Sequence, residues 1–228
     1  MEKSDKVYIV NAKATEFEPA NTWETTSKQI IMRFFSKWLN TQSLRGQNTR
    51  DDAENRYNKS CLDCQNCIYG DKICVNDVEI FDVLTIVGEK LYFCRNKIGF
   101  GFNVRDTCSQ IINSATLIQQ ATRERAVGDS GSFFENLYAR IIDAEGKSFS
   151  NFQQQQINSW QDLRDRVSNL TNVVFVFGHL SKCSNVDEAL TSIIKTESTI
   201  AKLEILRMKR RVEEMGMQFA MVNVLLDQ

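Results

Sequence analysis

The sequence predicts an α/β fold with a small mixed sheet flanked by helices. Two apolar runs, 78–87 and 90–94, are joined by Val87-Gly88-Glu89, which is typical of a β-hairpin. The run 172–177 is continuously apolar, as buried central strands are. A helical stripe then precedes a last strand, 217–225, and this order predicts a right-handed parallel crossover beside the hairpin.

Composition narrows the class of protein. The chain has 228 residues, of which 42% are hydrophobic and 25% charged, and these values are typical of globular proteins. The net charge of −1 means that any nucleic-acid contact needs a local basic patch. The first residues contain no apolar run of the length that a signal peptide or membrane span requires. We therefore expect a soluble, cytoplasmic protein without a membrane partner, whose seven cysteines are thiols or metal ligands.

The first part of the chain predicts elements that pack on the main domain. Residues 1–49 are expected to contribute a strand at 7–14 and a helix at 23–39, and residues 50–228 the domain itself. A further helix is predicted over 51–67.

The rest of the chain alternates helices with the strands already named. Helices are predicted over 104–125, 132–144 and 159–168, with a polar loop at 153–156. The clearest element is the terminal helix, which Gly216 ends as a C′ glycine. Its apolar stripe consists of Ile194, Ala201, Ile205, Met208, Val212 and Met215.

Four cysteines, Cys61, Cys64, Cys67 and Cys74, have the spacing C-x2-C-x2-C-x6-C. Zinc prefers four soft ligands in a tetrahedron, which paired C-x2-C motifs supply, and iron–sulfur clusters use similar spacing. Alternatively, the first three lie on one side of a helix and pack inward as small apolar residues. We predict the packed helix and keep zinc as the alternative.

Two other features give weaker evidence for a functional site. Gly128-Asp-Ser-Gly131 matches the nucleophile motif of chymotrypsin-like proteases, but the single histidine, His179, follows the serine, so we reject a protease. His179 comes just after the run 172–177, at a strand end where ligand sites gather in α/β sheets. A lone histidine is more often a capping or partly buried residue.

Polar residues gather on the predicted hairpin and the helix after it. They are Glu79, Asp82, Cys94, Asn96, Lys97 and Gln110. A metal-dependent phosphodiesterase needs a carboxylate on one strand, and a second ligand and a lysine, one residue apart, at the end of the next. The topology fits this requirement, and the residue types fit it in part. The alternative is an exposed strand end with mixed polar residues, and on a regular strand Glu79 and Asp82 would point to opposite faces.

These stretches resemble, in chain order, the restriction-endonuclease-like proteins of bacterial defence islands, a sporadically distributed family with a domain of unknown function. Arg56-Tyr-Asn58 resembles the family's Y-N, Val78-Glu-Ile-Phe-Asp-Val-Leu84 its E-I-C-D-L-L, and Ser109-Gln-Ile-Ile-Asn-Ser-Ala115 its Q-G-x-x-S-A. Leu91-Tyr-Phe-Cys-Arg-Asn-Lys97 stands where the family carries H-V-K-R. Lys202-Leu-Glu-Ile-Leu-Arg207, Arg210-Arg211 and Gly216 resemble its closing K-L-x-L-R, R-R and G-Y. The resemblance covers roughly residues 54–224.

The resemblance implies a restriction-endonuclease-like core over 50–228, with Asp82 as the Mg²⁺ carboxylate and Gln110 beside the phosphate. Cys94 stands at the family's histidine position and Asn96 at its lysine position, and Lys97 comes one residue later. Mg²⁺ is therefore expected as a cofactor only if the protein is an active metal-dependent nuclease, with Asp82, Lys97 and Gln110 as its catalytic residues.

The expected partners are nucleic acid, together with a partner protein or a second copy of the chain. Contacts with nucleic acid are expected from Lys97, Arg105, Arg207, Lys209 and Arg210. The resemblance thus implies a nuclease-fold component of an antiphage or mobile-element defence system, active or degenerate. The alternative is a non-enzymatic protein-interaction subunit that zinc stabilises through the four cysteines.

Overall fold

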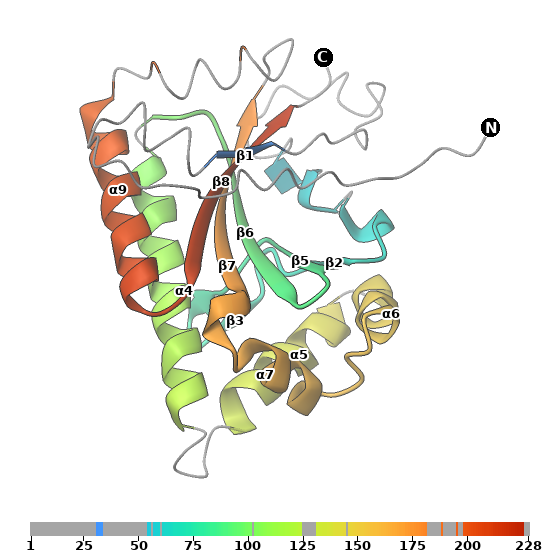
Figure 1. The fold of residues 1–228 in the computed structure, drawn as a ribbon. Helices are drawn as coiled ribbons and strands as arrows, with labels where there is room; N and C mark the ends of the chain where they lie inside the picture. Colours follow the sequence, from blue (N-terminus) through green and yellow to red (C-terminus); the bar gives the residue numbers. More distant parts are fainter. Residues whose placement is uncertain are drawn as a thin grey trace, which may run out of the picture.

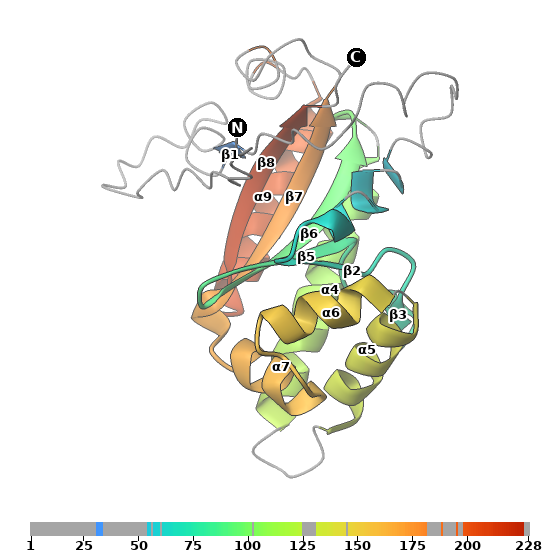
Figure 2. The same cartoon turned by 90° about the vertical axis from the view of Figure 1, so that its right-hand side faces the viewer.

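A mixed sheet forms the centre of the chain in its computed structural model (Figures 1 and 2). The structure describes residues 31–33, 54–55, 57–59, 61–101, 103–124, 131–144, 146–181, 188, 195 and 198–225. Within them, six strands follow the order β1-β8-β7-β6-β5-β2. Their bounds are Ile31–Arg33 for β1, Cys67–Tyr69 for β2, Val83–Val87 for β5, Lys90–Ile98 for β6, Val173–Ser181 for β7 and Gln218–Leu225 for β8. A separate small pair joins β3, Cys74–Val75, to β4, Val78–Glu79.

Strand directions divide the sheet into two halves. Strands β6, β7, β8 and β1 run parallel to one another, whereas β5 pairs antiparallel with both β6 and β2. The predicted hairpin is confirmed over β5 and β6, and its turn places Gly88 at a φ of 58°, where glycine has no steric penalty. The predicted α/β class with a mixed sheet is also confirmed.

Helices cover one face of the sheet and one of its ends. Helices α4, Val104–Glu124, and α9, Thr199–Glu214, lie side by side on one face (Figure 1). Helices α5, Gly131–Ala144, α6, Gly146–Gln154, and α7, Trp160–Val167, gather at the end where β6 and β7 begin (Figures 1 and 2). Short 3-10 turns, Cys61–Asp63 and Leu170–Asn172, precede β2 and β7. No helix in these described segments has the length and apolar character to cross a membrane.

The main core lies between α4, α9 and the sheet. Alternate residues of β6 and β7, such as Phe93 and Phe175, face it, and their rings stack 5.4 Å apart. The predicted stripe of α9 is confirmed by the burial of Ala201, Ile205, Met208 and Val212, and Gly216 follows the helix at a φ of 86°. Tyr92, Val174, Val176, Leu180, Ala220 and Val222 form a second apolar cluster on the opposite face, against which Tyr57 packs. Both faces are therefore buried, which explains the continuously apolar run of β7.

Three predicted elements are wrong. Residues 51–67 do not form one helix, because helical structure at 54–55 and 57–59 gives way to the turn Cys61–Asp63 and then to β2. Ile31–Arg33, within the predicted helix 23–39, is a strand that pairs with β8. The run 78–87 is interrupted at 80–82, because Val78–Glu79 pairs with β3 in the small sheet and the chain enters the main sheet only at Val83.

Other differences concern bounds and omissions. Helix α6 covers part of the polar tract that the sequence predicts as a loop, and it is held by Phe152 in the core. Strand β7 continues to Ser181, so His179 lies within the strand and is buried rather than following its end. The predicted strand 7–14 and residues 128–130 of the protease-like motif lie outside the described residues.

Candidate functional site

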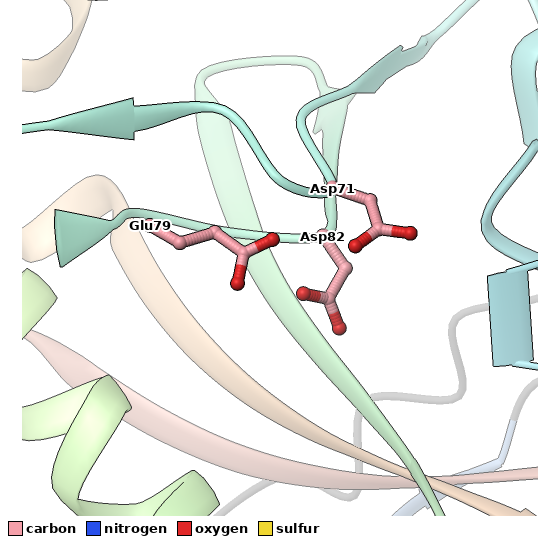
Figure 3. A group of neighbouring side chains, drawn as sticks. All are labelled: Asp71, Glu79 and Asp82. Atoms are coloured by element: carbon pink, nitrogen blue, oxygen red, sulfur yellow. The ribbon is translucent and has the colours of Figure 1, made fainter. Parts of the chain in front are cut away.

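Three carboxylates meet beside the antiparallel half of the sheet (Figure 3). Asp71 lies in the turn after β2, Glu79 ends β4, and Asp82 directly precedes β5. One carboxylate oxygen from each lies within 4.8 Å of those of the other two. The three side chains point toward one another, so segments separated by up to eleven positions in the sequence (82 − 71) build one acidic centre.

The interruption at 80–82 explains why Glu79 joins this centre. On a regular strand Glu79 would point away from Asp82, and the sequence predicts that separation. Instead, the backbone leaves β4 and re-enters the sheet only at Val83, which brings both carboxylates to one side. Gly70, which follows β2, packs directly against this segment. Its N–H donates to the Asp82 carbonyl at 2.9 Å, and a Cβ at Gly70 would lie 2.3 Å from the Phe81 ring.

Arg95 supplies the positive charge of the centre. Its Nη1 lies 2.6 Å from Glu79 Oε2 and 2.7 Å from Asp82 Oδ1, and its Nη2 donates to the Glu79 backbone carbonyl. The Arg95 side chain is 3% exposed, so water contributes little to its solvation. The guanidinium therefore bridges two carboxylates from inside the protein, as a bound cation would.

Asp82 is the most strongly perturbed carboxyl of the centre. Burial raises the pKa of Asp82 to about 7, against the opposing effects of Arg95 and of the Asn96 backbone N–H, which donates to Oδ2 at 2.6 Å. The neighbouring Glu79 and Asp71 raise this pKa further. The pKa of Asp71 is also raised, first by burial and then by Glu79. One guanidinium thus does not fully compensate three clustered carboxylates.

Two buried amide side chains, Asn96 and Asn58, lie next to the acidic centre. Asn96 Nδ2 donates to Asn58 Oδ1 at 2.8 Å, and both side chains are buried. The Asn96 amide fits only because residue 178 is glycine, since a Cβ there would lie 2.0 Å from Asn96 Oδ1. The Asn58 amide lowers the pKa of Asp71, although no acceptor in the described part of the chain meets hydrogen-bond geometry at Asn58 Nδ2.

The predicted catalytic residues are only partly brought together. Asp82 is at the centre, but Lys97 Nζ pairs with Glu54 Oε1 at 3.0 Å. Gln110 is exposed on α4, and the residue of that helix that reaches the centre is Ser114, whose Oγ lies 3.1 Å from the Glu79 carbonyl. Cys94 belongs to the side of β6 that carries the second apolar cluster, and the Asn96 side chain binds Asn58.

The other residues predicted to contact nucleic acid lie on the helices. Arg105 is exposed near the start of α4. On α9, Arg207 pairs with Glu204, Lys209 with Glu213, and Arg210 with Glu214. Each of these three cations thus has an acidic neighbour one turn away, so this part of α9 presents mixed charge rather than a basic stripe.

The prediction that Cys61, Cys64 and Cys67 lie on one helix is wrong. Cys61 begins a 3-10 turn, Cys64 lies in the bend after it, and Cys67 begins β2, with its Sγ 3.4 Å from Thr85 Oγ1. Asn151 on α6 explains this path, because its Nδ2 lies 3.0 Å from the Cys64 carbonyl and 2.6 Å from the Cys67 carbonyl. Among the described residues, no three of these sulfurs lie within 4.8 Å of one another, so the tetrahedron for zinc is not assembled.

The sequence analysis did not identify two residues of the acidic centre, Asp71 and Arg95. Asp71 follows a strand that the sequence predicts as helix, so nothing placed it near the hairpin. Arg95 could have been found, because a strand residue opposite Asp82 in an antiparallel pair must be a close neighbour, and the hairpin register was predictable from its turn.

The donor set fits a hard divalent cation. Carboxylate oxygens are the ligands that Mg²⁺ and Ca²⁺ prefer, and Asp71, Glu79 and Asp82 provide three carboxylates within reach of one ion. No protein-family model matches the sequence, and neither a curated protein nor a solved structure shows significant similarity to the chain. The chemistry of the centre therefore has to be inferred from its own residues.

Proposed function

We propose that the protein is a nuclease-fold component of a bacterial antiphage or mobile-element defence system that engages nucleic acid with a degenerate catalytic motif. The sequence resemblance supports the family assignment. The strand order supports the restriction-endonuclease-like core, because an antiparallel group, β2-β5-β6, is followed by α4 and the parallel strand β7. The active form of such a site would use Mg²⁺ held by Asp82.

The observation that carries the proposal is the face that Asp82 shares with β6. Val83 pairs with Cys94, so Asp82 lies opposite Arg95, one step further along the hairpin. Side chains alternate along a strand, so the positions that share this face are Arg95 and Lys97 rather than Cys94 and Asn96. A carboxylate on one strand and a lysine at the end of the next is the arrangement that metal-dependent phosphodiesterases use.

The departure from that arrangement lies at Arg95. The position two residues before the lysine would supply the second metal ligand, and here it carries a guanidinium that binds Asp82 at 2.7 Å. A cation at a ligand position opposes metal binding, and Lys97 is itself paired with Glu54. We therefore expect this centre to bind nucleic acid and to hydrolyse its phosphodiester bonds slowly or not at all.

Nucleic-acid binding is tested by fluorescence anisotropy with labelled single- and double-stranded DNA and RNA over a salt series. We expect at least one of these to bind, with an affinity that falls steeply with salt. Lys97→Ala should weaken binding roughly threefold to tenfold, as loss of one phosphate contact does. Lys90→Ala is the matched control, because Lys90 begins the same strand at its opposite end and donates to Gln218 at 3.2 Å.

Two results would overturn the proposal. Absence of binding to every nucleic acid at low salt would favour the protein-interaction alternative. Equal losses in Lys97→Ala and Lys90→Ala would show that the contact is not made at the Asp82 end of the hairpin.

A further inference from the structure

We propose that Asp71, Glu79 and Asp82 form a divalent-cation site for which Arg95 competes as a built-in cation. The biological use of this site rests on the proposed function, whereas the site itself rests on geometry alone. Arg95 would thus act as a plug whose removal or displacement allows a hard divalent ion to enter.

The position of the guanidinium is the first argument. Arg95 Nη1 lies at nearly equal distances, 2.6 and 2.7 Å, from one oxygen of Glu79 and one of Asp82. Calcium ions bind carboxylate oxygens at about 2.3–2.6 Å and magnesium ions at about 2.0–2.1 Å, so an ion between these two carboxylates would lie close to Nη1. The ion and the guanidinium therefore cannot occupy the centre together in this arrangement.

The incomplete fit of the plug is the second argument. Arg95 Nε is buried and has no acceptor within the residues that the structure describes. Asp71 belongs to the carboxylate group, and its Oδ2 accepts a hydrogen bond from the Tyr69 hydroxyl at 3.4 Å. The guanidinium therefore leaves one N–H donor without an acceptor, and its hydrogen bonds go to Glu79 and Asp82. A divalent ion carries twice the charge of the guanidinium, so it would neutralise the three carboxylates better.

The Asn58 amide is an independent sign of a missing ligand. Asn58 is 1% exposed and lies beside Asp71, and its Nδ2 finds no acceptor in the described segments. This inward N–H could donate to a water molecule or hydroxide on a bound ion.

Mn²⁺ binding to the purified full chain, followed by electron paramagnetic resonance and calorimetry, tests the competition without any nucleic acid. Arg95→Ala should bind Mn²⁺ at least about tenfold more tightly than the wild type, because a unit charge is removed next to the ion. Arg95→Ala with Asp71→Asn should lose most of that gain. Arg211→Ala, which removes an exposed cation paired with Glu214 on α9, should leave Mn²⁺ affinity unchanged.

Thermal unfolding covers the case in which Arg95→Ala folds poorly. The variant should then be restored by Mn²⁺, and the double variant should not. The proposal is overturned if folded Arg95→Ala binds Mn²⁺ no more tightly than the wild type, or if Asp71→Asn has no effect on its affinity. It is also overturned if Arg95→Ala stays unfolded in Mn²⁺ while Arg95→Lys folds. These outcomes are independent of nucleic-acid binding, so failure here and failure of the proposed function can be told apart.

Discussion

Arg95 and Asp82 face each other across the β5–β6 hairpin, with 2.7 Å between Nη1 and Oδ1. Both side chains are buried, so each charge depends on the other for compensation. Removing one partner of a buried pair leaves an uncompensated charge in the interior, whereas replacing both partners can be nearly neutral. This relationship makes the acidic centre a structural element as well as a candidate site.

The first prediction follows from that pair. Arg95→Met should lower the free energy of unfolding by about 3–5 kcal/mol in metal-free buffer. Adding Asp82→Asn to it should recover part of this loss, since one buried carboxylate is removed. Urea denaturation of the four members of the cycle measures the coupling, and Arg211→Ala should change stability by less than about 1 kcal/mol. Strict additivity of the two substitutions would contradict the pairing.

The second prediction concerns pH. The pKa of Asp82 is raised by burial to about 7 in the folded protein, against about 3.9 in an unfolded chain. The folded state therefore holds this proton more tightly, and the stability that Asp82 contributes is full below about pH 4 and is lost as pH rises through about 7. Relative to Asp82→Asn, the wild type should lose up to about 1.4 kcal/mol per pH unit in this window. The charged neighbours of Asp82 are Arg95, which lowers its pKa, and Glu79 and Asp71, which raise it. If the stabilities of the two proteins change with pH in the same way, the raised pKa of Asp82 is refuted.

The third prediction tests the amide layer behind Asp82. Gly178→Ala places a Cβ 2.0 Å from Asn96 Oδ1, so the Asn96 side chain must move and its bond to Asn58 is disturbed. We expect a loss of about 1–3 kcal/mol in chemical denaturation. Gly101→Ala is the matched control, because a Cβ there meets nothing within 4 Å, and it should be nearly neutral. Equal effects of the two substitutions would show that the close approach is unimportant.

The fourth prediction concerns the segment of the cysteines. Asn151→Ala removes the amide that lies on the Cys64 and Cys67 carbonyls, and it should cost about 1–3 kcal/mol, since buried carbonyls lose their donor. Cys64 should also react faster with a thiol reagent. Gln155→Ala, at 3.4 Å from the Gln65 carbonyl on the exposed side of this region, should change neither quantity. An unchanged thiol reaction rate in Asn151→Ala would argue against this role.

The hydrophobic pattern was sufficient to predict the elements in which that pattern is uninterrupted. Helices α4 and α9 keep one helical spacing throughout, so their sequences predict both the helix and its inward face, and the continuously apolar run of β7 predicts a strand buried on both faces. The Asp82 position could also be predicted, because it lies at a strand whose turn and register are encoded locally.

The centre itself depends on features that periodicity does not contain. Glu79 joins Asp82 because Glu79 ends a strand of the small β3–β4 pair, and the chain enters the main sheet only after Ile80 and Phe81. Asp71 follows β2, and the cysteine spacing before and at the start of this strand is also that of a helix face. The path of this segment depends on Asn151, a residue distant in the sequence, whose amide binds the Cys64 and Cys67 carbonyls. Tertiary contacts of this kind override local preference.

The most direct test of the account is cleavage of nucleic acid by the purified protein. End-labelled DNA and RNA, single- and double-stranded, are incubated with wild type and Asp82→Ala in Mg²⁺ and in Mn²⁺, after both proteins are shown to be folded. Because Arg95 lies where a second metal ligand is needed, we expect bound nucleic acid to remain intact, with no excess of products over Asp82→Ala. Metal-dependent cleavage by the wild type that Asp82→Ala abolishes would contradict a degenerate catalytic motif and establish an active nuclease.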